Sequence, residues 1–237
     1  MPPQPPRVAR GSDPVRARRC LVETVCVLAV FNLARALGLL GPALVADAIL
    51  FAAMALIAWS ERLSLADLGL RREALSTGLV WGLGAFGVVF LVLFLGAVIP
   101  ATNGFLQDSR AAISGGRMLY DVFVLILLGT VIPEEFAFRG VLLGTALQIF
   151  RRWGAIVLTS ALFGLWHIAP TLHTMSDNQT VRHTPAAIVV LGAIAATFVA
   201  GVIFGWLRLR SGSLVAPAIA HFATNGLALT FAWFAIH

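Results

Sequence analysis

Charged residues are scarce in this sequence. Only 12% of its 237 residues are charged, and the 17 basic residues are all arginine. About a quarter of the residues of a soluble domain are charged, so this composition argues against a soluble globule and against a disordered chain. The arginines outnumber the 11 acidic residues and give a net charge of +6. They lie between apolar runs, as in the loops of a membrane protein, which argues against a nucleic-acid-binding module.

Cysteine is also rare. The two cysteines, Cys20 and Cys26, lie at the start of the first apolar run. Their number and spacing exclude a disulfide framework and the Cys-x-x-Cys pattern of a zinc site. We therefore interpret both as buried small hydrophobic residues.

Apolar residues are abundant instead: they make up 59% of the chain, and the mean hydropathy is +0.91. A helix crosses a bilayer with about 20 residues, whereas barrel strands would show strict alternation, which is missing here. The sequence predicts an all-α, polytopic membrane bundle. Seven stretches are long enough, or nearly so, to span the bilayer: 21–40, 43–59, 76–99, 118–149, 153–169, 185–207 and 214–236.

The sequence predicts one domain that is preceded by a short N-terminal tail. Residues 1–19 are rich in proline and arginine and are expected to be a disordered cytoplasmic tail, and 20–237 form the membrane domain. The fourth stretch, 118–149, is too long for a simple span. It either protrudes from the membrane or bends at Pro133, which removes a helical hydrogen bond.

The arginines predict the orientation. With the N-terminus in the cytoplasm, twelve arginines fall on the inside and three on the outside, which the positive-inside rule favours. Arg35 and Asp47 lie near span ends, where we expect polar groups to reach the interface. The inside arginines are 7, 10, 16, 18, 19, 62, 71, 72, 151, 152, 208 and 210, and the outside ones are 110, 117 and 182.

Three ionisable residues follow Pro133 in the middle of the fourth stretch: Glu134, Glu135 and Arg139. Each would cost about 2.5–3.5 kcal/mol facing lipid, so they must face protein or a polar cavity. Glu135 and Arg139 are four residues apart on one helix face, and we expect them to form an ion pair. Glu134 points about 100° away from that face and lacks this partner. An unpaired carboxylate of this kind suits a general base or acid.

Two further stretches carry polar residues at a similar depth. His167 lies in the fifth, one turn after Phe163, which is expected to pack beside it. His221 and Asn225 share one face of the last stretch. With Glu134, these residues can meet about 14–24 Å from the cytoplasmic helix ends. One carboxylate, two imidazoles and an amide can hold a water, or zinc with a water, and stabilise an oxyanion.

At these residues the sequence resembles a known family. Residues 134–139 (EEFAFR) resemble an EExxxR motif, 163–167 (FGLWH) an FxxxH motif and 221–225 (HFATN) an HxxxN motif. All three occur, in this order, in the CPBP intramembrane proteases, which comprise type II CAAX prenyl endopeptidases and bacteriocin-processing or bacteriocin-immunity proteins. The motif-bearing core is about 118–237.

The resemblance implies a helical bundle, usually of eight spans, around an intramembrane polar cavity. An eighth helix would then lie in 101–117 or arise by splitting 118–149. By similarity, Glu134 activates the attacking water. His167, His221 and Asn225 bind the water, a metal or the oxyanion. Glu135, Arg139 and Phe163 support the site. Zinc held by Glu134, His167 and His221 and a metal-free glutamate mechanism are both open.

The predicted function is that of an intramembrane endopeptidase acting on a membrane-associated protein or peptide. An arginine- and alanine-rich chain of this length suggests a bacterial inner-membrane protein, with the bilayer and the substrate as its partners and no nucleic acid. The oligomeric state is open. One alternative is a non-catalytic scaffold or immunity protein of the same fold. A proton-coupled carrier is another, although the inverted halves typical of carriers are missing.

Overall fold

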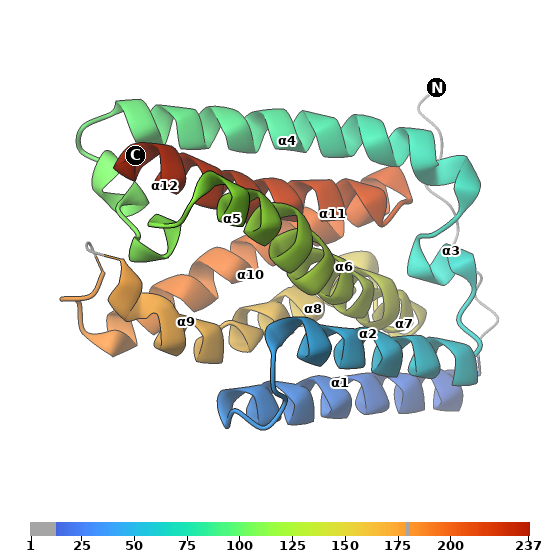
Figure 1. Ribbon diagram of the computed structural model, residues 1–237. Helices are drawn as coiled ribbons and strands as arrows, with labels where there is room; N and C mark the ends of the chain where they lie inside the picture. Colours follow the sequence, from blue (N-terminus) through green and yellow to red (C-terminus); the bar gives the residue numbers. More distant parts are fainter. Residues whose placement is uncertain (1–12, 179–180) are drawn as a thin grey trace.

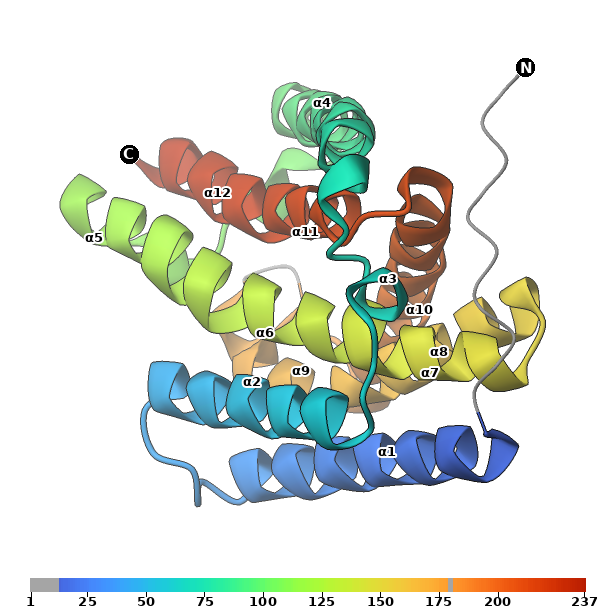
Figure 2. The same ribbon diagram turned by 90° about the vertical axis from the view of Figure 1, so that its right-hand side faces the viewer.

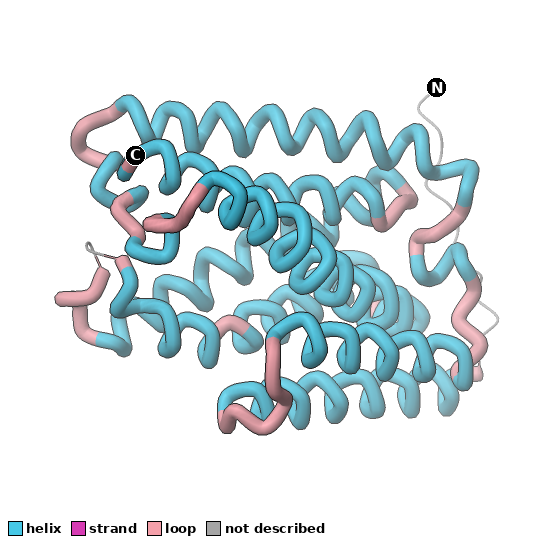
Figure 3. Tube along the Cα trace, in the orientation of Figure 1, coloured by secondary structure: helices cyan, strands magenta, loops and turns pink. Residues whose placement is uncertain are grey.

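The computed structural model describes residues 13–178 and 181–237. Within these residues the chain is helical, and no strand forms apart from one isolated bridge between Asp108 and Asn178 (Figure 3). This confirms the predicted all-α fold.

The helices follow one another with short connections. Their bounds are α1 Pro14–Ala36, α2 Ala43–Ser60, α3 Leu65–Leu68, η1 Arg72–Ala74, α4 Leu75–Val98, η2 Asn103–Leu106, η3 Ser109–Ala111, α5 Gly115–Tyr120, η4 Asp121–Val131, α6 Ile132–Glu135, η5 Phe136–Leu142, α7 Leu143–Ile149, α8 Arg152–Trp166, α9 Ile168–Thr174, η6 Met175–Asp177, α10 Ala186–Ser211, α11 Val215–Phe222, η7 Ala223–Leu227 and α12 Ala228–Ile236.

Six helical stretches of the described chain are long and apolar enough to cross a membrane: Ala43–Ser60, Leu65–Val98, Gly115–Ile149, Arg152–Asp177, Ala186–Ser211 and Val215–Ile236. The remaining predicted span, 21–40, lies mostly in α1, which has 23 residues but carries five charged ones. The region 101–117, where an eighth span was considered, holds only short 3₁₀ turns before α5 begins. The structure therefore supports a membrane bundle, and the total of seven to eight spans stays a prediction.

One long helix, residues 115–149, organises the bundle. It runs obliquely through the molecule, with α1 and α2 on one side and α4, α11 and α12 on the other (Figures 1 and 2). The helices α8, α9 and α10 complete the bundle on a further side, where α8 packs closely on α10. Each side of the central helix thus meets a different part of the chain.

The central helix neither splits nor ends at Pro133. It continues from Gly115 to Ile149 and changes its winding on both sides of Pro133: 121–131 and 136–142 are π-helical, and the short α6 lies between them. In the first π-helical segment the N–H of Ile132 bonds to the carbonyl of Leu127, five residues back. Wide turns of this kind are rare and often accompany functional sites. This one immediately precedes the two glutamates.

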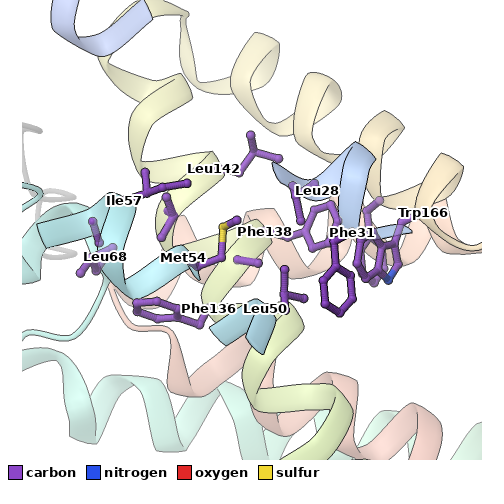
Figure 4. Close-up of a cluster of buried hydrophobic side chains, with 14 of the residues drawn as sticks. Leu28, Phe31, Leu50, Met54, Ile57, Leu68, Phe136, Phe138, Leu142 and Trp166 are labelled. Atoms are coloured by element: carbon purple, nitrogen blue, oxygen red, sulfur yellow. The ribbon is translucent and has the colours of Figure 1, made fainter. Parts of the chain in front are cut away.

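A hydrophobic cluster joins α1, α2, η5 and α8. Its largest members are drawn in Figure 4: from α1 and α2, Leu28, Phe31, Leu50 and Met54, and from η5 and α8, Phe138, Leu142 and Trp166. These residues are all less than 9% exposed. In a bilayer, lipid is as apolar as these side chains, so close packing rather than escape from water must hold the helices together.

The ends of α1 and α2 are tied by ion pairs. At one end Arg16 and Arg19 both bond to Glu61, which is buried. At the other end Arg35 lies 2.6 Å from Asp47, which is only 2% exposed. The expectation that Asp47 reaches the membrane interface is therefore wrong, because Asp47 is buried against Arg35. The side chain of Arg35 is 35% exposed, and its reach to the interface stays a prediction.

The predicted disordered tail is too long by six residues. α1 begins at Pro14, where proline suits the first helical position, and the side chain of Asp13 accepts a hydrogen bond from the N–H of Val15. The contacts of Arg16 and Arg19 with Glu61 then hold this first turn. Residues 1–12 of the predicted tail lie outside the described chain.

Small residues let α8 and α10 approach closely. A Cβ atom on Gly201 would lie 3.0 Å from the Cα of Ser160, and one on Gly205 would lie 3.3 Å from the side chain of Ile156. Gly192 is different, since a Cβ there would meet nothing within 4 Å. The close approach of the two helices therefore depends on Gly201 and Gly205 and not on Gly192.

Candidate active site

Glu134 lies in α6 with its two carboxylate oxygens in different surroundings. Its Oε1 accepts a hydrogen bond of 2.9 Å from the indole Nε1 of Trp166, at the end of α8. Its Oε2 is buried and has no hydrogen-bond partner within the described chain. Glu134 thus lacks an arginine partner, as predicted, but it is held by a neutral donor. One oxygen remains available for a proton or a water.

Glu135 contacts two other buried polar side chains, those of Arg139 and His221. Its Oε1 accepts from the Nη1 of Arg139 at 2.8 Å and lies 2.9 Å from the Nδ1 of His221. All three side chains are at most 3% exposed. The predicted ion pair of Glu135 and Arg139 is therefore confirmed, and it also reaches α11. A carboxylate paired with arginine is an acceptor, so the Nδ1 of His221 carries the proton and donates it to Glu135.

Aromatic rings surround the guanidinium of Arg139. Its central carbon lies 4.0 Å from the ring centre of Phe163, 5.0 Å from that of Phe204 and 5.9 Å from that of Phe138. Ring faces carry partial negative charge and attract a cation, most strongly away from water. Phe204 also stacks on the imidazole of His221 at 5.3 Å. Apolar residues therefore fix the position of a buried ion pair.

The Nε2 of His221 faces Asn225 and Glu134. With the proton on Nδ1, this atom offers a lone pair. It lies 3.2 Å from the Nδ2 of Asn225 and 3.9 Å from the Oε2 of Glu134. The predicted pairing of His221 with Asn225 along one helix face is thus present, and Glu134 joins them from a different helix. The last distance is too long for a hydrogen bond, and the lone pair of Nε2 accepts from the Asn225 amide, so the Oε2 of Glu134 stays available to a water.

His167 lies at the break between α8 and α9, and its Nδ1 lies 2.8 Å from the carbonyl oxygen of Phe163. Its ring contacts that of Phe163 at 4.6 Å, and Phe163 contacts His221 at 5.8 Å. The structure thus brings Glu134, His221 and Asn225 together directly, whereas the link to His167 runs through Phe163. His167 is half-buried, in contrast to the buried His221.

Comparison with known proteins agrees with this geometry. The family model described as type II CAAX prenyl endopeptidase Rce1-like matches residues 117–227, which contain the site from α5 to η7. The match covers just under half of the chain and supports its resemblance to the CPBP family. No significant match to a curated protein or to a solved structure was found. Together with the six apolar helices of the described chain, this match supports an integral membrane protein related to proteases.

The predicted zinc ligands do not form a metal site as they are arranged here. Within residues 13–178 and 181–237, no group of three His, Cys, Asp or Glu side chains is placed to hold a metal ion. The amide Nδ2 of Asn225, a hydrogen-bond donor, occupies the side of His221 whose lone pair a metal would need. Zinc binding by Glu134, His167 and His221 therefore stays a prediction from the sequence.

Sequence reasoning missed two residues of this site. Trp166 is the donor to Glu134, and Phe204 of α10 packs against both His221 and Arg139. Trp166 directly precedes His167 in the FxxxH segment, so its position was a usable signal, because a buried indole N–H usually needs an acceptor. Nothing in the apolar pattern of α10 distinguishes Phe204 from its neighbours.

A hollow of the described chain lies away from these residues. It has a volume of about 470 Å³ and is lined by residues at the end of α2 and the connection to α3: Ala58, Trp59, Ser60, Arg62 and Leu63. The site residues Glu134, Glu135, Arg139 and His221 are themselves buried.

Proposed function

We propose that this protein is an intramembrane endopeptidase in which Glu134 activates a water molecule for attack on a peptide bond. The observation that carries the proposal is the free Oε2 of Glu134, buried and 3.9 Å from the Nε2 of His221. The match of residues 117–227 to the model of a protease family supports it. The substrate is a membrane-associated protein or peptide.

The first step is proton transfer from water to Glu134. A water beside Glu134 and His221 donates a hydrogen bond to the Oε2 of Glu134, while the lone pair of His221 Nε2 accepts from Asn225. Glu134 takes the proton while the water oxygen attacks the carbonyl carbon of the substrate. Such general base catalysis contributes about 10²- to 10⁴-fold to the rate.

The attack places a negative charge on the former carbonyl oxygen. Asn225 has two amide N–H groups, and one of them suffices for His221, so the other is available to this oxyanion. His167 has a different role: its Nδ1–H donates to the Phe163 carbonyl, so its Nε2 offers a lone pair that can accept a hydrogen bond from a water and orient it. Asn225 lies in the π-helical segment η7, and His167 lies at the break between α8 and α9.

Collapse of this intermediate breaks the carbon–nitrogen bond. Glu134, now a carboxylic acid, gives its proton to the departing nitrogen, which leaves as an amine. The other product is a carboxylic acid, which ionises. Glu134 returns to its starting state, and the Glu135–Arg139 pair keeps His221 in the required tautomer throughout.

We infer the orientation from the arginine distribution. The N-terminus lies in the cytoplasm, as the excess of arginine in the segments next to α1, α2–α4, α7–α8 and α10–α11 favours. The membrane is a bacterial inner membrane. A C-terminal alkaline phosphatase fusion tests this, because the enzyme folds to an active form only outside the cytoplasm and the proposed topology places residue 237 there.

The catalytic proposal is tested with Glu134→Gln. Glutamine keeps the shape and the acceptor for Trp166 but cannot take a proton. Membranes from cells that produce equal amounts of wild type or variant are compared by mass spectrometry for new peptide termini. Termini that depend on wild type identify substrates, and their rate of formation should fall about 10²- to 10⁴-fold in the variant.

Glu73→Gln is the matched control, since the side chain of Glu73 is 74% exposed and remote in sequence from the site motifs. It should cleave as wild type does. Unchanged cleavage by Glu134→Gln would refute the mechanism. If instead no termini differ, and Glu134→Gln still supplies the cellular phenotype that Gly201→Leu destroys, the protein acts as a scaffold.

A further inference from the structure

Arg62 ends α2 in an unusual backbone conformation. Its φ is +51°, and in the described chain it is the one residue other than glycine with a positive φ. The N–H of Arg62 bonds to the carbonyl of Trp59, and that of Leu63 bonds to Ala58. These two bonds define the Schellman motif, which favours glycine at the left-handed position. A side chain there is disfavoured, because its Cβ approaches the following carbonyl oxygen.

Other helix ends of this chain use glycine for the same task. Gly38 follows α1, Gly69 follows α3 and Gly212 follows α10, with φ values of +70°, +74° and +71°. For folding alone, glycine would therefore suit the end of α2 as well as arginine does. Arginine at this position supplies a guanidinium that glycine cannot, and strained residues of this kind are often functional.

The side chain of Arg62 lines the hollow of about 470 Å³ at the end of α2. Trp59, one turn earlier, lines it too and is 77% exposed. The hydroxyl of Ser60 lies between them in the sequence and is also part of the lining. Arg62 is exposed and has no ion-pair partner within residues 13–178 and 181–237. The hollow thus combines a free cation with an exposed aromatic ring.

The surroundings of the hollow favour an anion. Glu61 is the acidic residue next to Arg62, but it is buried and already bonded to Arg16 and Arg19. These neighbours leave an excess of positive charge, and a guanidinium binds phosphate with two parallel hydrogen bonds.

The position of the hollow selects the kind of anion. It lies where the candidate span Ala43–Ser60 ends and the chain turns toward α3, at the right of Figure 1. Tryptophan is enriched at this level of a membrane protein, where the bilayer meets water. We propose that the hollow binds the phosphate headgroup of an anionic membrane phospholipid, with Arg62 on the phosphate and Trp59 beside the glycerol region. This proposal is independent of proteolytic activity.

The test uses the purified full-length protein in a neutral detergent. Thermal unfolding is measured with added dioleoylphosphatidylglycerol, and with dioleoylphosphatidylcholine as the uncharged comparison. Native mass spectrometry counts the bound lipid. Phosphatidylglycerol should raise the Tm of the wild type by several degrees more than phosphatidylcholine does, because a ligand that binds only the folded state stabilises it.

Arg62→Gly is the decisive variant. Without lipid its Tm should equal or exceed that of wild type, because glycine tolerates the left-handed conformation. The extra effect of phosphatidylglycerol should disappear, and the bound lipid should fall at least about tenfold, as expected for a lost charge-assisted contact. Arg152→Gln is the matched control: it removes an exposed arginine at the start of α8 and should keep the lipid effect. Trp59→Leu gives a second test and should weaken the extra effect of phosphatidylglycerol on the Tm.

Three results would overturn the proposal. The first is an equal effect of both lipids on the wild type. The second is an equal loss of the phosphatidylglycerol effect in Arg62→Gly and Arg152→Gln, which would indicate a diffuse electrostatic attraction between the lipid and the arginines. The third is a stabilisation by inorganic phosphate that matches that by phosphatidylglycerol, which would indicate a site for a free anion.

Discussion

The indole of Trp166 is expected to position the catalytic carboxylate, and Trp166→Phe isolates this role. Phenylalanine keeps a ring that stacks on Phe31 and contacts Phe138, which lie 5.8 and 5.5 Å from Trp166 between ring centres. It removes the N–H that bonds to Glu134 at 2.9 Å. Because the Oε2 of Glu134 has no partner in the described chain either, the variant leaves a buried carboxylate without a donor. A hydrogen bond to a charged group contributes about 1.5–3 kcal/mol, or roughly 10- to 150-fold in a rate if it is lost in the transition state.

The assay is cleavage of a substrate found through its Glu134-dependent termini, with kcat and KM measured separately. We expect kcat to fall and KM to change little. Trp233→Phe is the matched control, since it deletes the same kind of bond, from an indole to the carbonyl of Ile113 at 2.8 Å, in α12. Equal kcat values for the two variants would refute the positioning role. A change confined to KM would show that Trp166 binds substrate instead.

Two stability predictions follow from the packing around the site. Arg139→Met should lower the free energy of unfolding by about 3–5 kcal/mol, because it leaves Glu135 as a buried charge without its cation. Adding Glu135→Gln should recover most of this loss in thermal unfolding, and no recovery would count against the ion pair as the cause. Gly144→Ala should cost about 1–3 kcal/mol, since its Cβ would lie 2.5 Å from the backbone oxygen of Asp67. Gly192→Ala, whose Cβ meets nothing within 4 Å, should leave the Tm unchanged.

Local spacing predicted much of the fold and part of the site. Apolar runs of span length overlap the long helices because a bilayer demands internally bonded backbone. The four-residue spacings of Glu135 with Arg139 and of His221 with Asn225 predicted contacts along one helix, and both contacts are present. Such pairs are set by the geometry of the helix alone, so one sequence is enough to see them.

Contacts between helices were less accessible to sequence reasoning. Position near a span end suggested that Arg35 and Asp47 reach the interface separately, but they meet across α1 and α2. The stacking of Phe31 on Trp166 is another contact of this kind, and it brings α1, which lies outside the matched region, to the partner of Glu134. Helix order and crossing decide these pairs, and hydropathy contains little information on either.

The division of partners between the two glutamates explains how adjacent carboxylates can have different tasks. Arg139 bonds to Glu135, and Glu135 in turn bonds to His221, so the cation is used to fix a proton on Nδ1. Glu134 receives only the neutral indole of Trp166. A neutral donor bonds to a carboxylate less strongly than a guanidinium does, so Glu134 is not held in an ion pair as Glu135 is. A helix face offset of about 100° between neighbouring residues is what keeps Arg139 away from Glu134. The adjacent pair of glutamates thus yields one fixed acceptor and one available base, and exchanging Arg139 for a neutral residue would remove that distinction.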